Sequence, residues 1–138
     1  RLLVKRVVAR PGDRVALRDN RLSINGTPAR YERVRERMAE GESRPGHVLY
    51  RESILGSERY VMVRNSPGGD GAGSFGPVRV PEGHFLMLGD NRDHSRDSRA
   101  IGFVPEHRIL GRAGTVAFSL DHDNHYAPRL DRFLEALL

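Results

Sequence analysis

The chain has 138 residues and no cysteine, which excludes disulfide bonds, a thiolate nucleophile and a cysteine-based metal site. With 38% hydrophobic and 30% charged residues, it has the composition of a globular domain and not of a disordered chain. Its net charge of +5 would suit nucleic acid or an anionic membrane, but the arginines are scattered among acids, which favours a solvated basic surface over a nucleic-acid groove.

Strand patterns dominate the first half of the chain. The run "LLVKRVVA" at 2–9 is rich in leucine and valine and stops at a Pro-Gly turn. Residues 15–26 predict two strands joined by a tight Asp-Asn turn, followed by a second turn at Asn25-Gly26. Residues 31–46 are charged and end in Pro-Gly, so either a short helix or a mobile excursion fits them.

The second half continues the pattern and ends differently. Two strands are predicted at 47–55 and 59–65, then a glycine-rich loop at 66–77, then a strand, turn and strand over 77–90. Residues 107–121 predict a longer strand with a glycine interruption. The tail has apolar residues at helical spacing, namely Leu130, Phe133, Leu134 and Leu137. We therefore expect a mainly β protein of antiparallel sheets with a short C-terminal helix.

Lys5 is the only lysine of the chain, since every other basic residue is an arginine. A guanidinium stays charged at any working pH, whereas burial and neighbouring dipoles can make an ammonium lose its proton. On a strand, Leu3 and Val7 would share the face of Lys5 and shield it. A neutral lysine there could act as general base for a serine hydroxyl. The alternative is a codon preference for arginine that left one lysine by chance.

The second chemical feature is "GDNRDHSRDSRAIGFVP" at 89–105, which follows an apolar strand and so predicts a polar loop that leaves the core. Asp97 and Arg99 could pair and hold this loop rigid. A serine in it could hydrogen-bond a neutral lysine amine and orient it. The alternative is a surface loop with a structural ion pair.

Together the two stretches resemble bacterial signal peptidase I, a membrane-anchored Ser–Lys endopeptidase. The lysine strand of that family reads close to "(I/V)KR(V/A)(V/I)(G/A)xPGD", and residues 4–13 read "VKRVVARPGD". The other family box reads close to "GDNRDxSxDSRxxGxV", and residues 89–104 contain every fixed position of it. The resemblance covers most of residues 1–120 and is weaker over 31–80 and the tail.

The resemblance implies a role for each matched residue. Lys5 would be the general base, Ser95 would hydrogen-bond its amine, and Asp97 with Arg99 would form the supporting ion pair. The residues that build the loop would be Gly89, Asp90, Asn91, Arg92 and Ser98. An extended substrate would pair with the strand that leads into the lysine, along Leu2, Leu3 and Val4, with small pockets for alanine at its −1 and −3 positions.

One part of the family pattern is missing from these residues. The nucleophilic serine of the family lies in a Ser-Met-x-Pro-Thr-like segment several dozen residues before the lysine, and no serine here has that context. We expect the nucleophile, the oxyanion donor and a membrane anchor upstream of Arg1, and we expect the chain by itself to cleave nothing. Residues 1–26 and 81–120 would then form the core of a partial catalytic domain, 27–80 a variable second β region, and 121–138 a tail.

The resemblance further implies signal-peptide removal from exported preproteins at the extracytoplasmic face of the bacterial inner membrane. Its partners would be preproteins and the lipid surface, without nucleic acid, cofactor or metal; "DHDNH" at 121–125 matches no zinc spacing. Two alternatives stay open. One is a specialised relative, such as a conjugation-pilin or organelle inner-membrane peptidase. The other is a non-catalytic module that binds extended peptides.

Overall fold

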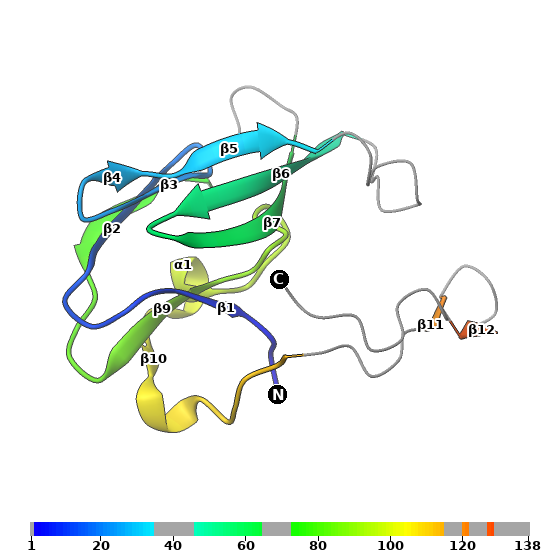
Figure 1. Cartoon of the computed structure of the whole chain (residues 1–138). Coiled ribbons are helices and arrows are strands. Elements are labelled where there is room, and N and C mark those ends of the chain that lie inside the picture. The colour runs from blue at the N-terminus through cyan, green and yellow to red at the C-terminus, as the bar shows by residue number, and fades with distance from the viewer. Residues whose placement is uncertain (1, 35–45, 65–72, 115–119, 122–126, 129–138) are drawn as a thin grey trace.

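The computed structural model describes residues 2–34, 46–64, 73–114, 120–121 and 127–128 (Figure 1). Besides one short helix, α1 (Ser98–Ile101), and one 3-10 turn, η2 (Glu106–Arg108), these residues form short strands. The strands are β1 (Arg6–Ala9), β2 (Arg14–Arg18), β3 (Arg21–Ile24), β4 (Thr27–Pro28), β5 (Arg30–Arg33), β6 (His47–Ile54), β7 (Ser57–Arg64), β8 (Phe75–Arg79), β9 (His84–Leu88), β10 (Val104–Pro105), β11 (Leu120–Asp121) and β12 (Ala127–Pro128).

The strands form antiparallel sheets, which confirms the predicted fold class. In the described ranges the strand orders are β4-β3-β2-β8, β5-β6-β7, β1-β9-β10 and β11-β12. The longest pairing is between β6 and β7, which run together from His47 opposite Arg64 to Ile54 opposite Ser57. No helix in the described part of the chain is long and apolar enough to cross a membrane.

The predicted tight turns are present and have the backbone that their residues favour. Asp19 and Asn20 join β2 to β3 with φ of 49° and 61°, and Asn25 and Gly26 join β3 to β4 with φ of 50° and 81°. Positive φ at both central residues suits the twist of a two-residue hairpin, and asparagine, aspartate and glycine adopt it at low cost. Local turn chemistry therefore sets the course of the chain from β2 to β4.

The main core lies where the sheets that contain β2 and β9 meet. Alternate residues of each strand point inward, so Val15, Leu17, Leu22, Leu86 and Leu88 are almost fully buried. Each such side chain contributes about 1.5–3 kcal/mol by leaving water. This core fixes β9, and with β9 it fixes the start of the polar loop that follows Leu88.

Three stretches differ from the sequence-based expectation, beginning at the N-terminus. The predicted strand 2–9 is shorter, because ladder pairing starts at Arg6 opposite Leu88 and residues 2–5 have no strand partner among the described residues. Residues 30–33 form strand β5 and no helix, because pairing with β6 outweighs their charged composition. The rest of the predicted excursion, 35–45, lies outside the described residues.

The third difference is at the C-terminal side. The long strand predicted over 107–121 is wrong for residues 107–114, which form the end of η2 and then irregular chain, and β11 begins only at Leu120. Runs with strand-like composition form a strand only where a partner edge is available. The predicted C-terminal helix falls on residues 129–138, outside the described part, while Ala127–Pro128 is strand β12.

Candidate active site

The structure brings Lys5, Gly89 and Ser95 to one point. Lys5 is partly buried and directly precedes β1, while Gly89 directly follows β9, the strand with which β1 pairs. A Cβ atom placed on Gly89 would lie 3.5 Å from Lys5 Nζ and 2.0 Å from Ser95 Oγ. The absence of a side chain at Gly89 therefore leaves the space in which the amine and the hydroxyl approach each other.

Ser95 faces this space with an unused hydroxyl. Its Oγ is buried and has no hydrogen-bond partner in the described part of the chain. Buried hydroxyls are rarely left unpaired, so such an atom marks a position that gains a partner in some other state. The hydrogen bond to the Lys5 amine is not formed here, and its formation stays a prediction.

Asp97 and Arg99 form a buried ion pair under the loop. Arg99 Nε and Nη2 donate to the two carboxylate oxygens of Asp97 at 2.9 and 2.8 Å, and Asp97 has no solvent exposure. Asp97 also caps α1 and accepts the backbone N–H of Gly89 at 2.9 Å. Burial acts to raise the pKa of the Asp97 carboxyl, but the bonds from Arg99 and Gly89 hold it below its ordinary value.

Ser98 fastens the helix to the strand that enters the site. Its Oγ accepts the backbone N–H of Met87 at 2.9 Å, and the residue is buried. Figure 1 shows the result, with α1 beside β9. Asp97 and Ser98 thus hold both sides of Gly89 in place through backbone N–H groups.

Asp90 and Asn91 tie the loop to two different strands. Arg6 of β1 donates two bonds to the Asp90 carboxylate, both at 2.9 Å, at a half-exposed position. The backbone of residues 90–92 docks on β7, since Met62 N–H donates to the Asp90 carbonyl at 2.8 Å and Arg92 N–H to the Met62 carbonyl at 2.9 Å. Asn91 stands directly opposite Met62 in this parallel bridge.

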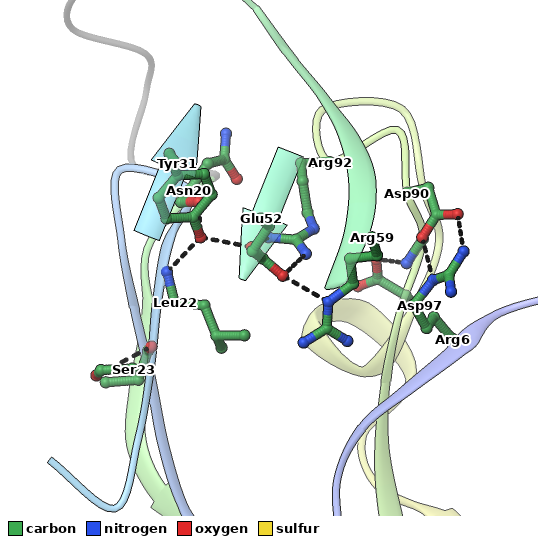
Figure 2. A network of polar contacts seen from close by, with 12 residues as sticks. Arg6, Asn20, Leu22, Ser23, Tyr31, Glu52, Arg59, Asp90, Arg92 and Asp97 are labelled. Atoms are coloured by element: carbon green, nitrogen blue, oxygen red, sulfur yellow. Dashed lines mark hydrogen bonds and ion pairs between the residues drawn. The ribbon is translucent and has the colours of Figure 1, made fainter. Parts of the chain in front are cut away.

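A second buried cluster was missed by the sequence reasoning. Glu52 of β6 has no solvent exposure, and Arg92 binds its two oxygens at 2.8 and 2.9 Å. Arg59 Nε lies 2.8 Å from the same carboxylate, and the Tyr31 hydroxyl donates to it (Figure 2). Burial acts to raise the pKa of Glu52, but Arg92 above all, with Tyr31 and Arg59, holds it below its ordinary value.

The signal that could have found Glu52 is its place in the strand. Inward and outward positions alternate along β6, and Glu52 falls on the face that carries the buried Val48 and Ile54. A carboxylate on that face needs a buried cation. Burial, with the nearby Glu52 charge, raises the pKa of Tyr31 to about 12, so its hydroxyl is a lasting donor to the carboxylate.

The predicted substrate residues lie on an open apolar segment. Leu2, Leu3 and Val4 are exposed at 74%, 44% and 77%, and within the described residues β1 is paired along one edge only. The expectation that Leu3 and Val7 shield Lys5 is wrong for this structure, because both are exposed and no described strand covers them. An unpaired edge beside apolar side chains is a surface on which an extended peptide can add as a strand.

Comparison with known proteins places these residues in a family context. The family described as signal peptidase, peptidase S26, matches residues 1–118. The signal peptidase I of Rickettsia typhi is 33% identical over 122 residues, which are 84% of this chain and 46% of that protein. That of Bacillus licheniformis is 34% identical over 116 residues, 83% of this chain and 50% of that protein.

Two further comparisons give the same family. The signal peptidase I of Pseudomonas fluorescens is 37% identical over 129 residues, 84% of this chain and 43% of that protein. A crystal structure of a signal peptidase I from Enterococcus faecalis covers 79% of this chain and 80% of its own, with 26% identity and a TM-score of 0.43. The chain spans about half the length, or less, of the curated relatives it matches.

Proposed function

Because this chain belongs to the signal peptidase family S26, we propose that it supplies the lysine half of a Ser–Lys active site that removes signal peptides from exported preproteins. The observation that carries the proposal is the meeting of Lys5 Nζ and Ser95 Oγ at Gly89, within 3.5 Å of one point. A lone lysine amine beside a hydroxyl, with a rigid loop behind it, is the arrangement that a lysine base needs.

The proposed chemistry begins at a serine that lies upstream of these residues in the complete gene product. Lys5, as the neutral amine, takes the proton of that serine hydroxyl, and the serine oxygen attacks the carbonyl after the −1 residue of the preprotein. The C–N bond breaks with the proton passing to the leaving amine, which leaves an acyl-enzyme. Water that gives a proton to Lys5 then hydrolyses the ester. Ser95 orients the amine, and Asp97 with Arg99 keeps the loop rigid.

The preprotein is proposed to bind as an added strand at the open edge before β1. Leu2, Leu3 and Val4 would lie along it, and pockets that admit only small side chains would select alanine at −1 and −3. Three exposed apolar side chains, Leu2, Val4 and Leu110, support a site that works next to a lipid surface. The proposed location is the extracytoplasmic face of the bacterial inner membrane.

The test is cleavage of a preprotein by the complete gene product, with substrates that differ only at the −1 position. We expect cleavage after alanine, seen in the mass of the released signal peptide, and none when phenylalanine stands at −1. The 138-residue chain under the same conditions is expected to cleave nothing, because it lacks the serine. Equal cleavage of both substrates, or none of either by the complete protein, would contradict the proposed function.

A further inference from the structure

We propose that Glu52 is a positioning residue of the active site, which holds the loop of residues 89–99 against Lys5 by binding Arg92 and Arg59. Its kinetic part rests on the proposed function, whereas its structural part depends on contacts within this chain alone. Glu52 acts through Arg92 and takes no part in the chemistry itself. It lies on β6, 40 positions before Arg92 in the sequence.

Donors from three segments surround the Glu52 carboxylate. Arg92 Nη1 donates to Oε2 at 2.8 Å and Arg92 Nη2 to Oε1 at 2.9 Å, while Arg59 Nε lies 2.8 Å from Oε1. Tyr31 donates its hydroxyl to Oε2, as Figure 2 shows. Since Tyr31 belongs to β5, Arg59 to β7 and Arg92 to the loop, a single buried side chain joins the β5-β6-β7 sheet to the loop.

A continuous set of contacts leads from Arg92 to the lysine. The Arg92 carbonyl accepts Arg99 Nη2 at 2.6 Å, and Arg99 is paired with Asp97. Asp97 in turn holds the Gly89 N–H at 2.9 Å. Gly89 is the residue against which the amine lies. A shift of Arg92 is therefore passed on to the position at which the amine and the Ser95 hydroxyl meet.

The loop has a second attachment that does not depend on Glu52. The backbone of Met62 in β7 pairs with the Asp90 carbonyl and the Arg92 N–H, at 2.8 and 2.9 Å. These bonds remain when the charge of Glu52 is removed. Loss of the carboxylate should therefore displace the loop without detaching it, which is what separates a positioning role from a purely structural one.

Charge explains why an isosteric amide would not serve. Arg59 and Arg92 are 5% and 2% exposed and both point at the one carboxylate of Glu52. Burial lowers the pKa of Arg59, and the charge of Glu52 opposes this. With glutamine at position 52, two buried guanidinium groups would face each other without a counter-charge, so Arg92 would move away.

The experiment compares Glu52→Gln with the matched control Glu32→Gln. Glu32 belongs to the adjacent strand β5 and also pairs with an arginine, Arg51, but its side chain is 67% exposed. In the complete gene product, kcat and KM are measured for one preprotein. In the 138-residue chain, 13C at the lysine ε position gives one lysine resonance, because Lys5 is the only lysine. Thermal unfolding shows which variants fold.

We expect Glu52→Gln to lower kcat by about 10- to 100-fold, with KM changed by less than about twofold, and to move the Lys5 resonance. Glu32→Gln should change neither. A folded Glu52→Gln protein with the wild-type kcat and an unmoved resonance would overturn the proposal. If Glu52→Gln does not fold, Arg92→Lys takes its place, with the same two outcomes, because lysine keeps the charge and loses the paired bonds.

The two readouts separate this proposal from the proposed function. If the complete protein cleaves no preprotein, the proposed function fails, and the Lys5 resonance alone decides whether Glu52 positions the loop. If cleavage occurs and is unchanged by Glu52→Gln, the proposed function stands and the role of Glu52 is wrong.

Discussion

The carboxylate of Asp97 accepts the backbone N–H of Gly89 at 2.9 Å, and both residues are buried. The bond closes the loop between them, because Asp97 caps α1 and Gly89 ends the strand of which Leu88 is the last residue. The space in front of Gly89 is where Lys5 and Ser95 meet. The bond thus sets the floor of the proposed site.

Gly89→Ala should fill this space. The new methyl carbon would lie 2.0 Å from Ser95 Oγ and 2.4 Å from Ser95 Cβ, far inside contact distance. We expect a loss of about 1–3 kcal/mol in the free energy of unfolding, measured with urea, together with loss of preprotein cleavage.

Gly111→Ala is the control, because no atom lies within 4 Å of the added carbon. It should change stability by less than about 0.5 kcal/mol. The double variant Gly89→Ala/Ser95→Gly removes the clash and should recover stability but not cleavage. A single Gly89→Ala variant as stable as wild type would show that the loop has more room than the structure gives it.

Asp97→Asn should destabilise the protein in a pH-dependent way. Arg99 would lose its buried counter-charge, at a cost of about 3–5 kcal/mol near neutral pH. Because the folded-state pKa of Asp97 is lowered, its contribution is fully present above the unfolded value and is lost as pH falls through the folded value. Urea unfolding from neutral pH to about pH 3 should therefore show a smaller loss of stability in the variant than in wild type. Parallel pH profiles for the two proteins would contradict this.

Asp90→Asn should behave differently, although Asp90 also binds an arginine with two bonds. The side chains of Arg6 and Asp90 are 30% and 47% exposed, so water screens their pair. We expect a change in the free energy of unfolding of about 0–1 kcal/mol, which added salt removes. An effect as large as that of Asp97→Asn, and insensitive to salt, would place this pair in a drier environment than the structure shows.

The sequence predicts the site loop well because its contacts are local. Asp97 and Arg99 are two positions apart, and glycine and asparagine place the turns at residues where the backbone needs positive φ. Glu52 escaped prediction because its partner Arg92 is 40 positions away, and only its inward place on β6 pointed to it. Charged residues 30–33 form a strand because β6 offers them an edge, which no local pattern records.

The surroundings of Lys5 could not be read from composition for the same reason. The apolar run 2–9 predicts a strand that shields the lysine, but pairing with β9 begins only at Arg6. β9 ends at Leu88, and the chain then turns into the loop, so Lys5 faces Gly89 and not a further ladder partner. Where a strand stops depends on the length of its neighbour.

The most direct test of the account is preprotein cleavage by the complete gene product with Lys5→Arg. Arginine keeps the charge and much of the bulk of lysine, but it cannot lose a proton at working pH. We predict that the variant folds, as judged by its thermal unfolding, and that cleavage falls to the level of the uncatalysed reaction. A folded Lys5→Arg protein that cleaves as fast as wild type would show that Lys5 is not the base and would contradict the proposed mechanism.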